Sequence, residues 1–288
     1  MISYKRSLVI LATTVVLLGV VSFFSLIQKP NSRLMTVSYL SVGQGDATFV
    51  ETPSGLKYLI DVSGGPQILE ALSKELSFME KRIDGVFLTH MDADHISGLV
   101  PVLEYYDVGE IFISTQFDKE SLYGVLEEYV EETKNPVIMH YIDGTNRIIL
   151  DEKAGVLIDV IFPIPDYPFN DRNDRSFVLN LIFGETKFLF TGDASTEIEN
   201  YLVEQKSSSL DADILQVGHH GSNTSSSEFF LKTVSPTYAV ISAGKDNDFG
   251  HPHQEVIERI LELEIKMVET VEDNQVFVTD GGSVARRN

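Results

Sequence analysis

The chain of 288 residues contains no cysteine, which excludes disulfide bonds, thiolate metal sites and a cysteine nucleophile. Acidic residues are absent from the first thirty positions, where Lys5, Arg6 and Lys29 are the only charged residues. Basic residues are scarce in the rest of the chain, where 19 Lys and Arg stand against 43 Asp and Glu, a net charge of −24. The sequence therefore divides into an apolar, weakly basic leader and a strongly acidic body.

The acidic body argues against a general nucleic-acid-binding surface, because phosphate backbones are attracted by a positive field. It has about 258 residues, enough to bury a sizeable core. With 43% hydrophobic and 23% charged residues, the composition is that of a globular protein rather than a disordered one.

The leader contains an uncharged run at residues 7–28, mostly Val, Leu, Ile and Phe. As a helix this run would be roughly 32 Å long, enough to cross a hydrocarbon core of about 30 Å. Lys5 and Arg6 predict a cytoplasmic N-terminus, and therefore a single-pass membrane protein with its body outside the cytoplasm. The alternative is a cleaved signal peptide and a secreted body, although the run is long for that role and no A-x-A site follows. We expect an anchor or signal segment at 1–28, a linker at 29–34 and one domain at 35–288.

The body alternates short β-branched runs with segments of helical periodicity. Strands are expected at residues 35–42, 48–51, 57–62, 85–89, 110–114, 137–141, 147–150, 156–162, 177–183, 187–190, 213–217, 238–242 and, closing the chain, 276–279. Helices are expected at residues 66–81, 96–106, 119–132, 196–204, 229–233 and 254–264. Many strands with helices interspersed predict an α/β fold of layered sheets covered by helices.

The most informative segment is THMDADH at residues 89–95, directly after a predicted strand. It holds four potential metal ligands within six residues: His90, Asp92, Asp94 and His95. Imidazole and carboxylate together suit Zn, Mn or Fe. In a turn between a strand and a helix they would converge on one point. A solvated acidic turn with incidental histidines is the alternative interpretation.

Further candidate ligands lie at the ends of other predicted strands. Six of the seven histidines fall into three clusters, and His140 is interpreted as an ordinary strand residue. Ligands in layered α/β folds collect at one edge of a sheet, so this recurrence favours a site over isolated turn residues. The candidates outside residues 89–95 are Asp61, Asp193, His219, His220, His251 and His253.

Together these strings resemble the metallo-β-lactamase superfamily and, more closely, the extracellular hydrolase domain of the ComEC competence proteins. The matching strings are VGQGDA (42–47), LID (59–61), residues 89–98, Asn173-x-x-Ser176, FTGD (190–193), VGHHGS (217–222) and GHP (250–252). Single pieces are weak signals, but the set occurs in the family's order between residues 36 and 282. The resemblance implies an αββα sandwich with a dinuclear metal site at one edge.

The resemblance also implies metal-assisted hydrolysis with two divalent ions, Zn or Mn. We expect His90 and Asp92 to bind one metal, Asp94 and His95 the other, and Asp193 to bridge them. His219, with His220 or His251, would complete the ligand shells. Asp94 is also the candidate for proton transfer, while Asp46 and Asp61 are expected to orient ligands through hydrogen bonds. Asn173 and Ser176 are the candidate contacts to substrate.

Two departures from the superfamily's commonest pattern bear on the metal. Asp92 stands where that pattern has histidine, as in the ComEC branch, and a site richer in oxygen favours Mn over Zn. The superfamily often has a histidine before the Thr-Gly-Asp strand, where this chain has Asn173, Asp174 and Ser176. His219, His220 or His251 would replace that imidazole.

The ComEC resemblance implies a phosphodiesterase or nuclease acting outside the cytoplasm. A hydrolase of a smaller extracellular ester, either a lactone or a wall-polymer phosphodiester, is the alternative, and a non-catalytic, metal-stabilised binding module is the third. The expected partners are a small-molecule or short phosphodiester substrate, and a membrane through residues 7–28. The net charge disfavours long nucleic acid, although Arg172, Arg175 and Lys245 would form a local patch for a short strand. With one candidate membrane segment and no multi-helix channel, DNA transport is not expected.

Overall fold

A computed structural model describes residues 34–116, 137–169 and 171–287 of the chain. The expected membrane segment at 7–28 and the expected helix at 119–132 lie outside these residues. Within the described part, no helix combines the length and the apolar character needed to span a membrane.

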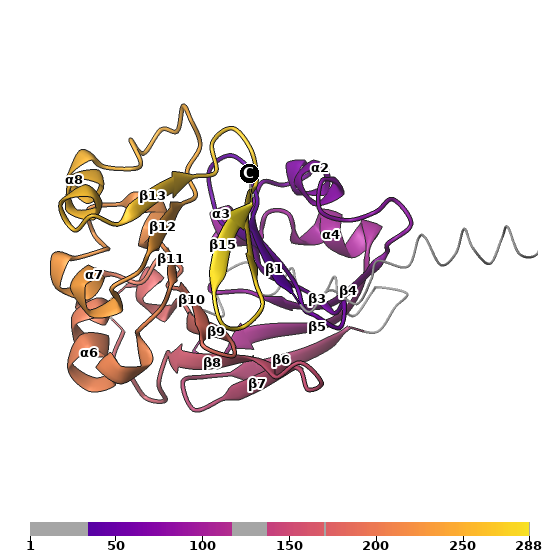
Figure 1. The fold of residues 1–288 in the computed structure, drawn as a ribbon, viewed down its shortest axis with the longest axis horizontal. Coiled ribbons are helices and arrows are strands. Elements are labelled where there is room, and N and C mark those ends of the chain that lie inside the picture. Colours follow the sequence, from indigo (N-terminus) through magenta and orange to yellow (C-terminus); the bar gives the residue numbers. More distant parts are fainter. Residues whose placement is uncertain (1–33, 117–136, 170, 288) are drawn as a thin grey trace, which may run out of the picture. The chain divides into compact units, whose positions relative to one another are not determined.

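Two β-sheets form the centre of the described domain, with helices on their outer sides (Figure 1). The eight-stranded sheet has the order β15-β14-β1-β2-β3-β4-β5-β6. Its strands are β1 (Met35–Tyr39), β2 (Ala47–Glu51), β3 (Lys57–Val62), β4 (Arg82–Phe87), β5 (Asp107–Ser114), β6 (Ile138–Ile142), β14 (Gln275–Thr279) and β15 (Val284–Arg287). The seven-stranded sheet has the order β13-β12-β11-β10-β9-β8-β7. Its strands are β7 (Arg147–Asp151), β8 (Val156–Phe162), β9 (Val178–Phe183), β10 (Thr186–Phe190), β11 (Ile214–Gln216), β12 (Tyr238–Ile241) and β13 (Lys266–Glu269).

The helices divide between the two sheets. The first group is α2 (Gln67–Ser73), α3 (Ala93–Ile96) and α4 (Leu99–Tyr105), and the second is α6 (Thr196–Lys206), α7 (Glu228–Val234) and α8 (Gln254–Glu262). Short 3-10 turns are η1 (Asn173–Arg175), η2 (Ser207–Ser209) and η3 (Gly218–Gly221).

Three hydrophobic cores hold these layers together. The central core joins the inner faces of both sheets, where the rings of Tyr39 and Phe190 stack with their centroids 5.9 Å apart. A second core packs α2 and α4 onto the eight-stranded sheet, and a third packs α6, α7 and α8 onto the seven-stranded sheet. The predicted α/β class, with two sheets covered by helices, is thereby confirmed, because each amphipathic element buries its apolar face against a neighbour.

The predicted helix at residues 66–81 is too long. In the structure α2 ends at Ser73, and turns follow up to the start of β4. The apolar spacing that suggested a longer helix includes Met79, whose side chain is 84% exposed. The apolar spacing of the sequence therefore continues beyond the end of the helix, to a residue that does not pack against the domain.

The predicted helix at residues 96–106 corresponds to α4, which begins three residues later at Leu99, while Ile96 ends the separate helix α3. The backbone of Gly98 lies against β3, and its amide donates a hydrogen bond to the Val62 carbonyl at 2.6 Å. A Cβ atom at this position would lie 2.7 Å from the same carbonyl oxygen, so the close approach requires glycine.

The C-terminal part of the sequence contains two strands that its local pattern did not predict. β13 is the edge strand beside β12, and β15 pairs antiparallel with β14. The strand at residues 276–279, predicted to close the domain, is therefore the first strand of a hairpin. Both missed strands are short edge strands and bury few side chains, so their sequence carries little alternation.

Candidate metal centre

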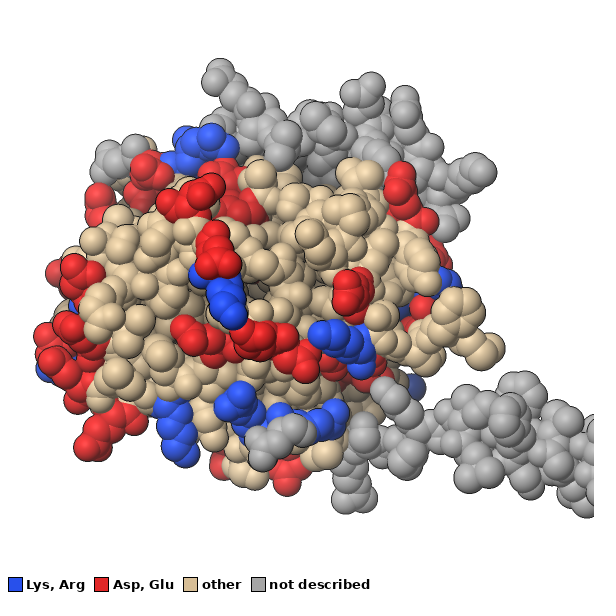
Figure 2. All heavy atoms as spheres, turned by 90° about the horizontal axis from the view of Figure 1, so that it is seen from above, with Lys and Arg blue, Asp and Glu red and all other residues tan. Residues whose placement is uncertain are grey.

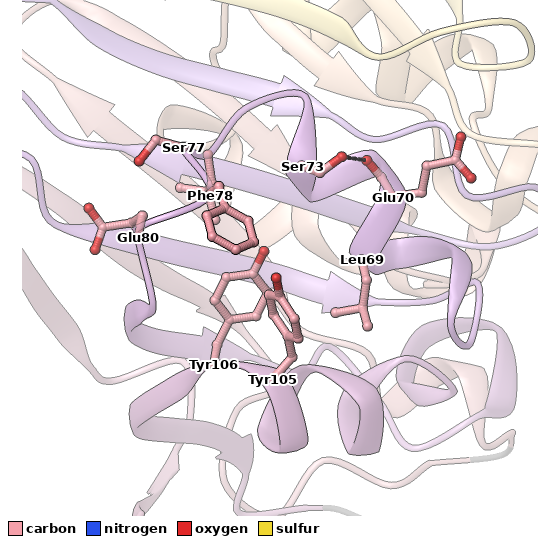
Figure 3. A pocket seen from close by; sticks show the side chains of 9 residues that line it. Leu69, Glu70, Ser73, Ser77, Phe78, Glu80, Tyr105 and Tyr106 are labelled. Atoms are coloured by element: carbon pink, nitrogen blue, oxygen red, sulfur yellow. Dashed lines mark hydrogen bonds between the residues drawn. The ribbon is translucent and has the colours of Figure 1, made fainter.

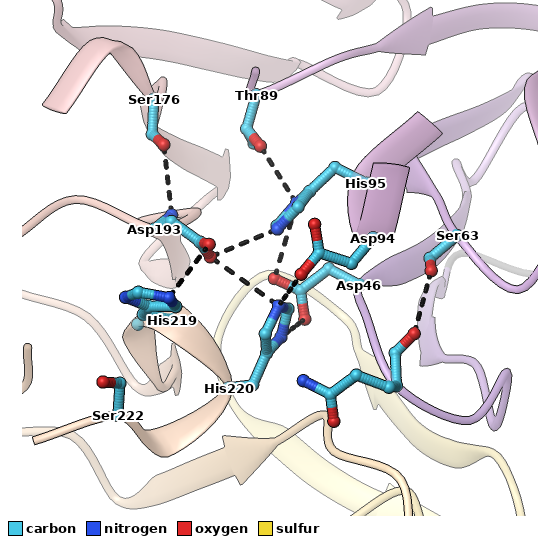
Figure 4. A network of polar contacts seen from close by, with 12 residues as sticks. Asp46, Ser63, Thr89, Asp94, His95, Ser176, Asp193, His219, His220 and Ser222 are labelled. Carbon is cyan, nitrogen blue, oxygen red and sulfur yellow. Dashed lines mark hydrogen bonds and ion pairs between the residues drawn. The ribbon is translucent and has the colours of Figure 1, made fainter. Parts of the chain in front are cut away.

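Four buried side chains from distant parts of the chain come together at one edge of the two sheets (Figure 4). Asp46 precedes β2, His95 lies in α3, Asp193 follows β10 and His220 lies in η3. One ligand atom from each residue lies within 4.8 Å of those of the other three. Residues separated by up to 174 positions in the sequence are thus placed at the distance needed to share a cation.

The unsatisfied polar atoms of this group indicate what it binds. Both carboxylate oxygens of Asp46, Nε2 of His95, Oδ1 of Asp193 and both ring nitrogens of His220 are buried without a hydrogen-bond partner. Leaving such atoms unpaired costs about 1–3 kcal/mol each, so native structures rarely do so without a ligand. Two imidazoles and two carboxylates are a donor set that suits Zn or Mn, and the residues therefore fit a divalent cation.

Asp193 is the hub of the group. Its Oδ1 atom lies 3.1 Å from Nε2 of His95 and 3.8 Å from Nε2 of His220. Its Oδ2 atom lies 3.5 Å from Nε2 of His219 and 3.8 Å from Nε2 of His90. One carboxylate thus faces four imidazoles, with its two oxygens directed to different pairs.

The pKa shifts reflect the crowding of opposite charges. Burial alone would raise the pKa of Asp193, but His95 and His220 hold it well below its usual range. Burial alone would lower the pKa of His220, but Asp46 and Asp193 raise it to about 10. The pKa of His90 falls to about 3, because it is buried and faces His95. His90 is therefore neutral at pH 7, while His220 carries a proton that a cation would displace.

Asp61 lies behind His95. Its Oδ2 atom is 2.8 Å from Nδ1 of His95, and its other oxygen accepts a hydrogen bond from the amide of Thr89 at 2.8 Å. The Thr89 hydroxyl donates to Oδ2 at 2.7 Å. Such a contact fixes the ring orientation and leaves Nε2 directed at the centre. The placement is the one expected for a residue that orients a ligand.

Substituting Asp61 with asparagine is expected to weaken divalent-metal affinity by about 10- to 100-fold. Asparagine tolerates the left-handed backbone found at this position, where φ is 55°, so the change removes the negative charge with little backbone strain. A competition titration with a chromophoric chelator measures the affinity. Asp84→Asn is the matched control, since Asp84 also accepts a backbone hydrogen bond, from Lys57, on the same sheet. Equal affinities for Asp61→Asn and the native chain would contradict the role.

The two acidic residues of the 89–95 segment, Asp92 and Asp94, lie on the side of the site nearer solvent. Oδ2 of Asp94 is 3.4 Å from Nε2 of His220, and this contact lowers the pKa of Asp94 to about 2. Oδ1 of Asp92 accepts a hydrogen bond from the guanidinium of Arg172 at 2.5 Å. Asp92 is thus engaged by a basic side chain and lies outside the group of four, and its predicted role as a ligand beside His90 stays a prediction.

The remaining predicted residues surround the centre. The His251 ring centroid is 5.6 Å from that of His219 and 6.3 Å from that of His220. Ser176 is fully buried, and its hydroxyl accepts a hydrogen bond from the Asp193 amide at 3.1 Å, which positions the hub. Asn173 begins η1 and accepts a backbone hydrogen bond from Ser176. A substrate contact by Asn173 or Ser176 stays a prediction.

The local backbone explains how adjacent residues reach one centre. His219 and His220 both adopt the left-handed conformation, with φ of 50° and 55°, between Gly218 and Gly221. For non-glycine residues this costs roughly 1–2 kcal/mol each. The conformation directs His219 toward Asp193 and His220 toward Asp46 and Asp94. Strain of this kind is typical of functional sites.

One residue predicted to orient ligands lies within the group of four, and one contributing residue was missed. Asp46 was expected to orient ligands through hydrogen bonds, and its Oδ1 lies 3.4 Å from Nδ1 of His220, whose other ring nitrogen faces Asp94 and Asp193. Asp46 also has an oxygen within reach of the other three members of the group, so a role as a ligand and a role in orienting ligands both stay predictions. Its position between two strands in VGQGDA was the available signal. Thr89 was not singled out, although its hydroxyl contacts Asp61 and lies 3.2 Å from Nδ1 of His90.

The structure also contains a pocket of about 340 Å³ between α2 and the end of α4 (Figure 3). None of the predicted site residues lines it. Its lining consists of Leu69, Glu70, Ser73, Leu76, Ser77, Phe78, Glu80, Tyr105 and Tyr106. The pocket therefore lies apart from the metal-binding group and is not part of the candidate centre.

The surface around the domain is acidic, and many basic side chains are paired. Figure 2 shows acidic side chains spread over one face, with basic ones beside several of them. Of the predicted cationic patch, Lys245 contacts Glu272 at 3.1 Å and Arg172 contacts Asp92. The Arg175 guanidinium lies 5.6 Å from the centre of the Phe169 ring. These pairings leave little positive charge to attract a phosphate backbone.

Comparison with known proteins gives a family match over most of the domain. The family model of the Metallo-beta-lactamase superfamily matches residues 40–245. ComE operon protein 3 of Bacillus subtilis (strain 168) is 29% identical over 296 residues, which is 94% of this chain and 36% of that protein. Recombination protein 2 of Haemophilus influenzae is 31% identical over 262 residues, 88% of this chain and 30% of that protein. The chain thus spans about a third of the length of these curated relatives.

Solved structures share the fold at low sequence identity. The metallo-beta-lactamase fold protein YhfI from Bacillus subtilis has a TM-score of 0.56 and 11% identity, covering 84% of this chain and 98% of that chain. A long form of RNase Z from yeast has a TM-score of 0.53 and 10% identity, covering 86% of this chain and 42% of that chain. At these identities the similarity concerns the fold alone.

Proposed function

Because this chain belongs to the metallo-beta-lactamase superfamily, we propose that it is a metal-dependent phosphodiesterase that cleaves nucleic-acid strands outside the cytoplasm. The resemblance that the motifs indicated is confirmed by the family match and by the competence-related relatives. The observation that carries the proposal is the buried group of Asp46, His95, Asp193 and His220, whose unpaired donor atoms fit a divalent cation. The phosphodiester substrate and the extracytoplasmic location are supported by the curated relatives named as competence and recombination proteins.

We further propose that the centre holds two ions. The group of four would hold one ion. The donors for a second ion would come from His90, Asp92, Asp94 and His219, with His251 beside His219. Asp193 faces both sets through its two oxygens. When bound, the ions supply Lewis-acid chemistry, which acidifies water and stabilises negative charge on a phosphoryl oxygen.

The protein's own residues supply positioning and proton transfer. Asp94 is the most accessible carboxylate of the site, 34% exposed against 29% for Asp92, and its pKa of about 2 keeps it ionised at neutral pH. Its oxygen can accept a hydrogen bond from the attacking water and hold that water in line with the phosphorus. The Arg172 guanidinium is paired with Asp92 at the mouth of the site and holds that carboxylate in place.

The acidic surface favours a second candidate, hydrolysis of a smaller extracellular ester such as a lactone or a wall-polymer phosphodiester. A small substrate reaches the centre without a long cationic track. The net charge of −21 would repel a long polyanion and would affect a short ester much less.

One set of assays separates the candidates. The purified full chain, loaded with Mn or Zn and analysed for bound metal, is given bis-p-nitrophenyl phosphate, labelled single-stranded DNA and a lactone panel. We expect metal-dependent cleavage of the phosphodiesters, lost in His90→Ala. Turnover of lactones with intact DNA would support the second candidate. A chain that binds no metal and turns over no substrate would overturn both.

A further inference from the structure

An exposed aromatic ring lies beside the candidate centre, on the loop between β12 and α8. Phe249 is 62% exposed, and its ring stacks on that of His251 at 5.7 Å with an interplanar angle of 23°. His251 in turn contacts the rings of His219 and His220. Phe249 is therefore two ring contacts away from the side chains that face Asp193.

The loop that carries this ring is held by one central side chain. The Asn247 amide nitrogen donates hydrogen bonds to the carbonyls of Gly244 and His251, at 2.7 and 2.6 Å. Its side-chain oxygen accepts hydrogen bonds from the amides of Phe249 and His251, at 3.1 and 2.9 Å. The ring is thus presented to solvent from a defined backbone. Because the loop is already ordered, the binding of a planar ligand would cost less conformational entropy.

We propose that Phe249 is a stacking platform for a nucleobase next to the phosphate held at the metal centre. The proposal rests on the phosphodiesterase function and deepens it by naming the substrate class, a single strand with unpaired bases. In a duplex the base faces are covered by neighbouring pairs, whereas in a single strand they are open to aromatic side chains.

The charge of the domain supports this class. Proteins that bind strands mainly through phosphates need clustered cations, and here Arg172 and Lys245 are paired with Asp92 and Glu272. Stacking contributes affinity through the π-face of the base and needs no positive field. An aromatic platform beside the metals therefore suits an acidic enzyme that acts on a strand. A polyol-phosphate polymer offers no such planar face.

The test compares two strands that differ only in their bases. The full chain with Mn is given a single-stranded oligonucleotide and the same strand with abasic sites around the cleaved bond, and the preference is the ratio of their kcat/KM values. Phe249→Ala is expected to lower this preference by about 5- to 150-fold, mostly through KM, and Phe249→Trp to restore it. Phe229→Ala is the matched control, because Phe229 is 59% exposed on α7, and it should keep the native preference.

A binding readout separates the failure of this inference from the failure of the proposed function. Fluorescence of a strand containing 2-aminopurine reports stacking without turnover, and quenching that is lost in Phe249→Ala supports the platform even if no strand is cleaved. Cleavage by the native chain with the same preference in Phe249→Ala, or equal quenching by both proteins, would overturn the platform. If the native chain neither cleaves nor quenches any strand, both proposals fall.

Discussion

Replacing Asp193 with alanine is expected to lower kcat/KM for phosphodiester hydrolysis by roughly 10³-fold or more. Asp193 faces His90, His95, His219 and His220, so its loss removes a donor from the group of four and the contact that joins the two sets. The buried imidazoles would also lose the carboxylate that favours their protonated forms. The measurement is steady-state hydrolysis together with bound metal per chain, and both should fall.

Asp211→Ala is the matched control for this substitution. Asp211 lies in the loop before β11 and pairs with Lys187 of β10, and its side chain is 71% exposed, whereas that of Asp193 is buried among histidines. Loss of this pair should change stability by less than about 1 kcal/mol and leave bound metal at the native level. If Asp193→Ala keeps native activity, as Asp211→Ala should, then Asp193 does not have the central role in the metal centre that is assigned to it here.

The second large effect is a loss of stability at high pH in the chain freed of divalent ions. The pKa of His220 is raised from 6.5 to about 10, because Asp46 and Asp193 outweigh the effect of burial. A raised pKa means that the protonated form stabilises the fold fully below pH 6.5, and that this contribution is lost as pH rises toward 10. Between pH 7.5 and 9 the free energy of unfolding should therefore fall by at least about 1.4 kcal/mol per pH unit, because Asp193 and Asp61 also raise the pKa of His95, which acts in the same direction.

Urea unfolding at several pH values measures this slope. With saturating Mn or Zn the slope should disappear or reverse, because the cation takes the place of the proton on the imidazole. His220→Asn keeps a polar side chain that does not titrate, and it should reduce the slope in the metal-free chain. A free energy of unfolding that stays constant from pH 7.5 to 9 in the metal-free native chain would refute the assignment of a protonated His220.

Much of the domain could be predicted from local sequence. The strands β1 to β3 and the helices α6 and α8 follow from alternation and helical spacing, because these periods depend on neighbouring residues alone. The same holds for the strand ends that carry Asp61, His90 and Asp193, since a polar residue after an apolar run is visible in the chain itself. Local patterns failed where tertiary contacts decided the outcome, as at Gly98, whose approach to Val62 separates α3 from α4 and delays the start of the predicted helix.

The sequence by itself determined the kinds of ligand and the order in which they occur, because residue chemistry and short-range spacing are independent of the rest of the fold. The tertiary structure decided which side chains meet. It placed Asp46 with His95, Asp193 and His220, engaged Asp92 with Arg172, and set His251 beneath the exposed ring of Phe249. The group of four and the Asp92–Arg172 pair depend on loops from both sheets meeting at one edge, and distances of a few ångströms between such loops are fixed by the packing of the whole domain. The contact of Phe249 with His251 depends on the fold of the single loop between β12 and α8.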